Sequence, residues 1–289
     1  MHPHTPALAA AVRSVPESRR LDRLHHAYSG QSGVVVTCGP SLVTFDPARL
    51  RQALTGRVVF AVKQAIDVVG PEADLLCFNA YNVSRYRVPR RSTMRVYSSE
   101  PSGKLPQMNR FDLRLPVAPH SGHLADSLVA RKDFDDHMLE RTPVRPWGPG
   151  ILHELVFYLA IHLGLSDLTT IGWDIANARG HNVHFYDAPD NFFDRGRSDA
   201  YKLVGVREGL PPHLKAALRW TRTASIHTRG GVYNRTTMIP GESEVVAAAT
   251  IATASWLATH GVRLRVVGDS EFVDPDLPRL TQDEFYAGI

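Results

Sequence analysis

The stretch Gly33-Val34-Val35-Val36-Thr37-Cys38-Gly39-Pro40-Ser41-Leu42 decides the fold. Its first half is a short continuous apolar run, which is typical of a buried strand in a parallel sheet. The run breaks at Gly39-Pro40-Ser41, a turn signal. Asp46-Pro47 then opens a helix, with Asp as the cap and Pro at the first helical position. The stretch therefore predicts a strand, a turn and a helix in the order that α/β proteins use.

The same succession of strand, turn and helix recurs along the chain. Two apolar helices are predicted at residues 150–164 and 242–260, where apolar side chains recur at helical spacing. Residues 98–146 are rich in Pro, Ser, Gly and charge, so we expect loops and short helices there. These repeated units predict an α/β fold with a doubly wound, mostly parallel, Rossmann-like sheet. The further predicted strands are Val58–Val62, Asp74–Asn79, Met94–Tyr97, Leu168–Gly172 and Val262–Val267.

The domain organisation follows from the same pattern. Residues 1–31 are predicted to be an N-terminal arm that packs on the body of the protein. Residues 32–289 show no linker and no internal repeat, so they are predicted to form a single nucleotide-binding α/β domain. The polar stretch 177–238 interrupts this domain, either as an inserted lid over a site or as a solvated loop.

The composition indicates which classes of protein are unsupported: membrane-spanning, secreted and nucleic-acid-binding proteins. No apolar run approaches the roughly 20 residues that span a bilayer, and the N-terminal residues lack the apolar segment of a secretory signal. The two cysteines, Cys38 and Cys77, suit a reducing compartment, so we expect a cytoplasmic protein. Most basic residues are arginine, which suits an anionic ligand, although an Arg-rich composition explains them equally well. No zinc spacing or basic–aromatic motif indicates nucleic-acid binding.

Two enzyme classes lack their signatures. There is no Gly-x-Ser-x-Gly elbow of a Ser/His/Asp hydrolase, and no Gly-x-Gly-x-x-Gly of a dehydrogenase after the first strand. His181 and His184 are spaced like a pair of zinc ligands on one helical face, but no third ligand stands at convincing spacing. No metal site is therefore predicted, and these two histidines remain candidates for contacts with phosphate or sugar.

Polar residues end the predicted strands, where ligands bind in open α/β sheets. The amides of the turn after the first strand suit a phosphate or a ribose. Asp174 suits a ribose or sugar hydroxyl, or else caps a turn. Arg145 precedes the entrance of the first apolar helix, where it contacts phosphate or is solvated at the surface. The candidate nucleotide-binding residues are Cys38, Gly39, Pro40, Ser41, Gln64, Asn79, Arg145, Gly148, Gly150 and Asp174.

The strand ends also carry a resemblance to a known family. Cys38-Gly39-Pro40-Ser41-Leu42 resembles the Asn-Gly-Pro-Ser-Leu turn of the bacterial sialyltransferases of glycosyltransferase family 42. Lys63-Gln64 is similar to the family's Asn-Gln, and Cys77-Phe78-Asn79 to its Phe-Tyr-Asn. Leu163-Gly164 and Ile171-Gly172-Trp173-Asp174 keep the family's interval between Leu-Gly and Gly-x-Asp. The resemblance covers most of residues 33–270 through short motifs.

The resemblance implies a glycosyltransferase A-like fold and an inverting, metal-independent transfer of a sugar to an acceptor hydroxyl. The donor would be a CMP-activated, sialic-acid-like sugar, with no further cofactor. The family's first tyrosine falls on Ala176, while His184 falls near its second tyrosine. The family's catalytic histidine lies just before the closing helix, where residues 236–241 hold none, and His227 is the nearest upstream. The resemblance therefore makes His184 and His227 the candidate catalytic residues.

Two other functions remain open on the same fold. A nucleotide-dependent pyrophosphokinase or hydrolase would call for clustered acidic metal ligands, and the strand ends offer mainly Asp174. A non-catalytic nucleotide-binding protein would explain the missing tyrosine and the displaced histidine. The acceptor, the sugar and the oligomeric state are left open, a homo-oligomer included.

Overall fold

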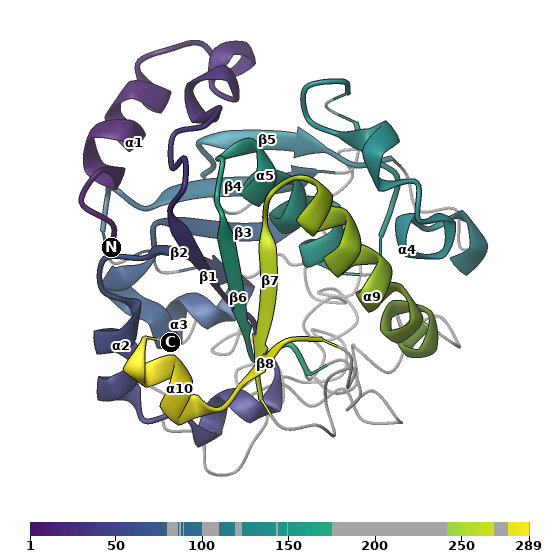
Figure 1. Ribbon diagram of the computed structural model, residues 1–289. Helices are drawn as coiled ribbons and strands as arrows, with labels where there is room; N and C mark the ends of the chain where they lie inside the picture. Colours follow the sequence, from purple (N-terminus) through teal and green to yellow (C-terminus); the bar gives the residue numbers. More distant parts are fainter. Residues whose placement is uncertain are drawn as a thin grey trace, which may run out of the picture.

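The computed structural model holds one sheet of eight strands, in the order β5-β4-β3-β2-β1-β6-β7-β8. All the strand pairs that the structure describes are parallel. The prediction of an α/β fold with a mostly parallel sheet is therefore confirmed (Figure 1). The strands are β1 (Ser32–Val36), β2 (Val58–Val62), β3 (Leu75–Asn79), β4 (Met94–Ser99), β5 (Leu113–Pro116), β6 (Asp167–Ile171), β7 (Arg263–Val267) and β8 (Arg279–Leu280). The structure describes residues 1–79, 86, 88, 90–99, 110–118, 123–142, 144–148, 150–174, 242–268 and 277–288.

The order of the strands reverses at β1. From β1 the chain adds β2, β3, β4 and β5 on one side, and it then returns to add β6, β7 and β8 on the other. In the central ladders Val36 is in register with Ala61 of β2 and with Ile171 of β6. β2 is apolar throughout, as is β1 after Ser32, because both faces of the sheet are covered, whereas β6 also holds Asp167, Thr169 and Thr170.

Helices cover both faces of the sheet (Figure 1). One face packs against α1 (Thr5–Arg13), α5 (Phe157–His162) and α9 (Glu242–Thr259) in one apolar cluster. The other face packs against α2 (Pro47–Leu54), α3 (Ile66–Val69) and α10 (Gln282–Ala287) in a second cluster. The short α4 (Leu128–Arg131) lies beside α9. Alternate residues of β1 serve the two clusters, with Val35 in the first and Val34 in the second.

Several predicted elements are confirmed and others were wrong. Asp46 caps α2 as predicted, because its carboxylate accepts hydrogen bonds from the N–H groups of Ala48 at 2.9 Å and Arg49 at 2.7 Å. Residues 98–146 were expected to hold only loops and short helices, yet they contain the short strand β5. The first apolar helix does not begin as an α-helix, since Leu152–Val156 is a π-helical turn that leads into α5. The pattern also missed β8 and α10.

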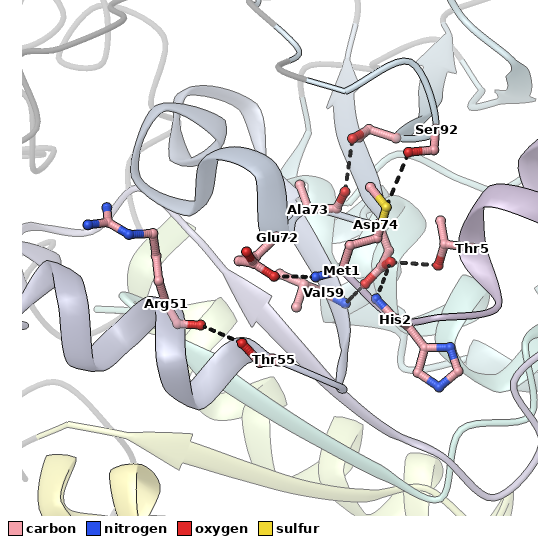
Figure 2. Close-up of polar contacts among 11 residues, drawn as sticks. Met1, His2, Thr5, Arg51, Thr55, Val59, Glu72, Ala73, Asp74 and Ser92 are labelled. Atoms are coloured by element: carbon pink, nitrogen blue, oxygen red, sulfur yellow. Dashed lines mark hydrogen bonds and ion pairs between the residues drawn. The ribbon is translucent and has the colours of Figure 1, made fainter.

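The N-terminal arm packs at the amino end of the sheet, where the strands begin. There the buried carboxylate of Asp74 accepts hydrogen bonds from His2 N at 2.8 Å, Thr5 Oγ1 at 2.5 Å and Val59 N at 2.8 Å (Figure 2). Further along the arm, Tyr28 N donates to the carbonyl of Leu163 at 2.9 Å. The arm is thus tied to β2, to β3 and to the end of α5.

Two further predictions concern a lid and a membrane-spanning helix, and the structure describes only part of the residues that bear on them. The predicted lid at 177–238 lies outside them. Within them, no helix combines the length and the apolar character needed to cross a membrane.

Candidate functional site

The carboxyl ends of β1 and β6 form the point where the strand order reverses. The next described α-helices along the chain, α2 after β1 and α9 after β6, pack on opposite faces of the sheet. The two strands stay paired past their ends, because Thr37 N donates to Ile171 O at 2.9 Å and Gly39 N donates to Gly172 O at 2.9 Å. In open α/β sheets this is the preferred place for a ligand.

The turn after β1 is held against the segment after β6 by Asp174. The Asp174 carboxylate accepts hydrogen bonds from Ser41 N at 2.7 Å and from Ser41 Oγ at 2.6 Å. Gly39 is required between them, since a Cβ there would collide with the Gly172 carbonyl oxygen and with the Asp174 carboxylate. Two predicted site residues therefore contact one another, and Asp174 caps the turn after β1; the turn that follows Asp174 lies outside the described residues. Burial raises the pKa of Asp174, and its bonds from Ser41 oppose that rise.

A lysine stands at the carboxyl end of β2, next to this turn. Lys63 has φ of 52°, a left-handed conformation that few non-glycine residues adopt and that clusters at functional sites. The thiol of Cys38 donates to Val62 O at 3.2 Å, and burial raises its pKa to about 12, with the positive charge of Lys63 opposing the rise. Cys38 is thus a buried neutral thiol rather than a nucleophile. Gln64, another predicted site residue, is buried beside Lys63.

A second carboxyl group faces the carboxyl ends of β2 and β4 from the π-helical turn. The Glu154 side chain is 3% exposed. It accepts hydrogen bonds from Ser98 Oγ at 3.4 Å and from the N–H of Gly148. Burial raises the pKa of Glu154 to about 8, although Lys63 and Arg145 act in the opposite direction. A π-turn within an α-helix is frequently found at a functional site.

Arg145 supports the π-helical turn from inside the protein. The interpretation that Arg145 is solvated at the surface was wrong, because its side chain is fully buried, whereas its contact with phosphate stays a prediction. Its Nε donates to the carbonyl oxygen of Glu154, and its guanidinium lies 5.8 Å from the centre of the Tyr158 ring. Burial lowers the pKa of Arg145 to about 10, and Tyr158 and Glu154 oppose that shift. Arg145 holds the main chain that carries Glu154.

Aromatic rings join the two carboxyl groups of this region. Trp173, which precedes Asp174, lies 5.9 Å from the ring of His153 and 5.6 Å from that of Phe157. His153 in turn precedes Glu154 on the π-helical turn. The segment after β6 therefore packs directly on the turn that holds the buried glutamate.

The remaining predicted residues are placed as follows. The backbone of Asn79 ends β3 in register with Ser98, at the same end of the sheet. Gly148 is buried beside Glu154, and Gly150 is exposed with φ of 86° just before the π-helical turn. The candidate catalytic residues His184 and His227, like His181, lie outside the described residues.

Sequence reasoning missed Lys63, Ser98 and Glu154. One signal for Glu154 was available: the pair His153-Glu154 interrupts an otherwise apolar helix, and buried charged residues are rare unless they have partners or a function. No local pattern marked Ser98, whose contact with Glu154 joins residues 56 positions apart.

Two cavities lie away from this end of the sheet. One of about 410 Å³ is lined by Asp133, Asp135, Asp136 and Trp256, beside α9. The other, of about 450 Å³, lies near the amino ends of β1, β6 and β7, against His25 and Glu140. Across the described part of the chain, no three His, Cys, Asp or Glu side chains stand close enough together to hold a metal ion.

Comparison with known proteins gives no relative for this chain: no family model, no curated protein and no solved structure matches it. Function must therefore be argued from the residues at the carboxyl end of the sheet.

Proposed function

We propose that the protein is a glycosyltransferase that binds a CMP-activated, sialic-acid-like sugar at the carboxyl ends of β1 and β6 and transfers the sugar to an acceptor hydroxyl. The transfer inverts the anomeric carbon and needs no metal. In this proposal the fold is a Rossmann-like variant of the glycosyltransferase A type, and residues 177–238 form a lid.

The contact between Ser41 and Asp174 carries the nucleotide-binding half of the proposal. It keeps the turn after β1 tight at the point where the strand order reverses, and it places the Asp174 carboxylate at the carboxyl end of the sheet. A carboxylate in this position suits a hydrogen bond from a ribose or sugar hydroxyl. The missing Cβ at Gly39 lets the Gly172 carbonyl and the Asp174 carboxylate lie directly against the turn.

The charges at the same end of the sheet suit an anionic leaving group. Departure of CMP leaves negative charge on its phosphate, which cations and N–H donors stabilise. Lys63 supplies a half-buried cation at the end of β2. An acceptor hydroxyl also needs a base. The resemblance to family 42 gives this role to a histidine, so that His184 and His227 are the candidates.

The first test is calorimetry and thermal shift with CMP, CDP, UDP, GDP and ATP, each with and without magnesium. We expect selective binding of CMP without metal, followed by transfer from CMP-sugar donors. A ligand at a hundredfold excess over its dissociation constant stabilises the folded protein by about 2.7 kcal/mol. Binding of ATP that depends on magnesium would instead favour phosphotransfer, and CMP binding without turnover would favour a non-catalytic protein.

Matched variants at the two ends of the sheet locate the site. We expect Asp174→Asn, just after β6, and Ser41→Ala, in the turn after β1, to weaken CMP binding at least tenfold, about 1.4 kcal/mol. The controls are Asp167→Asn and Ser166→Ala at the amino end of β6, where Asp167 pairs with Arg263 at 2.8 Å and Ser166 donates to Gly30 O at 2.9 Å. Equal losses at both ends of the sheet would contradict a site at the carboxyl end.

A further inference from the structure

The buried side chain of His162 connects two segments that lie far apart in the sequence. His162 is the last residue of α5, and its side chain is 5% exposed. Its Nδ1 lies 2.5 Å from Glu140 Oε1, and its Nε2 lies 2.9 Å from the carbonyl oxygen of Leu21 in the N-terminal arm. His162 therefore ties the arm to the segment 138–142.

Both partners of the His162 ring are hydrogen-bond acceptors. A carbonyl oxygen cannot donate, and neither can an ionised carboxylate. Burial raises the pKa of Glu140, but the hydrogen bond from His162 and the nearby charge of His25 outweigh it, so that this pKa lies below its usual value. Because Glu140 is thus ionised at neutral pH, both nitrogens of His162 carry a proton in this arrangement. The ring is an imidazolium, and the end of a helix suits its positive charge.

The arm places further imidazoles next to this ring. The ring of His25 lies 5.2 Å from that of His162, and the ring of His26 lies 4.2 Å from that of His25. Asp22, the neighbour of Leu21 in the arm, pairs with the exposed Arg19 at 2.6 Å. The groups of the arm that face His162 are therefore a carbonyl and a second imidazole.

The segment 138–142 and the end of α9 supply the remaining charged groups. His260, which follows α9, pairs with Asp135 at 2.7 Å, and Arg141 donates to the carbonyl oxygen of Asp135 at 3.2 Å. Glu140 is left to pair with His162. Among the described residues, Glu140 is thus the carboxylate that balances the charge of this ring.

We propose that the doubly protonated ring of His162 holds two walls of the cavity of about 450 Å³ together, so that the cavity opens as pH rises. The arm lines one wall of this cavity and the segment 138–142 lines another. At alkaline pH the N–H bond at Nε2 breaks and its proton passes to solvent. This proton leaves first, because a lone pair that faces the neutral carbonyl of Leu21 is repelled less than one that faces a carboxylate. The arm around Leu21 then comes away.

The hydrogen bonds of the arm limit this movement to residues 17–25. These residues form two short 3₁₀ turns, Glu17–Arg19 and Asp22–Leu24. Residues 26–30 stay bound to the end of α5, because three of their N–H groups donate to successive carbonyl oxygens there. These bonds are His26 to His162 at 2.8 Å, Tyr28 to Leu163 at 2.9 Å and Gly30 to Gly164 at 2.8 Å.

The first experiment observes the ring protons directly, by nitrogen NMR of the full chain with isotope-labelled histidine. At about pH 7 an ordinary histidine, with a pKa of about 6.5, is mostly neutral. The signals that disappear in His162→Gln should instead show both ring nitrogens protonated. A neutral ring at this pH would overturn the proposal.

The second experiment measures hydrogen exchange of the backbone amides at about pH 6 and about pH 9, corrected for the intrinsic pH dependence of exchange. A histidine in the unfolded chain loses its proton near pH 6.5, so the contribution of the imidazolium is complete below about that value and is lost as pH rises. Protection of residues 17–25 should therefore fall about tenfold more than that of residues 26–30.

Three variants separate the proton from the packing. His162→Gln has no ring proton to lose, so residues 17–25 should be equally protected at both pH values. Glu140→Gln, at a side chain that is 40% exposed, keeps an oxygen acceptor but removes the balancing charge, so the fall should begin at lower pH. His25→Gln removes a neighbouring imidazole and should retain the fall. Equal losses in residues 17–25 and 26–30, or a fall that persists in His162→Gln, would overturn the proposal.

Discussion

The two ends of the sheet treat their buried carboxyl groups differently. At the amino end, Asp74 accepts three short hydrogen bonds and binds the N-terminal arm to β2 and β3 (Figure 2). At the carboxyl end, Glu154 accepts one long hydroxyl bond and one backbone bond, beside a lysine in a left-handed conformation. Burial raises the pKa of both groups, but hydrogen bonds oppose this more fully at Asp74. The amino end ties the N-terminal arm to the sheet through Asp74, whereas the carboxyl end holds a buried carboxyl with a strongly raised pKa.

The largest effect is expected at the amino end. Asp74→Ala removes the acceptor for three donors, two of them buried backbone or hydroxyl groups, and should lower the free energy of unfolding by about 3–5 kcal/mol. Urea unfolding measures the loss. CMP affinity at a temperature where the variant stays folded should match that of the unmodified protein. A loss below about 1 kcal/mol would show that the arm is not anchored through this carboxylate.

Two glycines of the β1 segment give the next comparison. Gly39→Ala forces a methyl group against the Gly172 carbonyl and the Asp174 carboxylate, and should weaken CMP binding about a hundredfold, near 2.7 kcal/mol. Gly33→Ala at the amino end places its Cβ 2.7 Å from a Leu165 methyl group and should cost about 1–2 kcal/mol of stability. Its affinity for CMP should be unchanged. Calorimetry and urea unfolding separate the two effects, and a binding defect in Gly33→Ala would contradict the distinction.

Two residues with the same positive φ, one of them at the carboxyl end of the sheet, give a comparison with a smaller expected effect on CMP affinity. Lys63 and His26 both have φ of 52°. Glycine relieves the strain of this conformation but adds entropy to the unfolded chain, so each glycine variant should stay within about 1 kcal/mol of the parent stability. Lys63→Gly should nevertheless lower CMP affinity about fivefold to tenfold, roughly 1 kcal/mol, because it removes a cation from the site. His26→Gly should bind CMP normally.

The smallest expected effect on stability and on CMP affinity is that of removing an exposed ion pair. Arg49 and Asp283 form an exposed ion pair at 3.1 Å, far from either buried carboxyl. Arg49→Ala should change stability by less than about 1 kcal/mol and leave CMP affinity unchanged, since solvent screens such pairs. A larger change in urea unfolding would indicate that the cation–ring contact of Arg49 with Tyr286, at 4.2 Å, carries additional stability.

Sequence reasoning succeeded where the signal was local. The apolar runs gave β1 and β2, and Asp46-Pro47 gave the start of α2. Because the carboxyl ends of parallel strands share one end of the sheet, it also placed Ser41 and Asp174 there. It could not foresee that the two side chains bond to each other, since their contact joins residues 133 positions apart.

The residues that sequence reasoning missed depend on tertiary context. Asp74 was read only as the first residue of a strand, although its partners His2, Thr5 and Val59 make it an anchor. Glu154 lay within a predicted apolar helix, and only the π-turn and the surrounding strand ends reveal its environment. The strands β5 and β8 are short and lie at the two edges of the sheet, where apolar patterning is weakest.

The reversal of strand order at β1 also matters while the protein is being made. Residues 1–116 hold five neighbouring strands, and β1 has an open flank until β6 has been synthesised. Its partner on that flank is distant, as the bond from Thr37 to Ile171 spans 134 residues. At the usual speeds of translation the flank waits on the order of 10 s for β6. Unpaired strands of this kind attract other chains, so the nascent protein is expected to need chaperones during that interval.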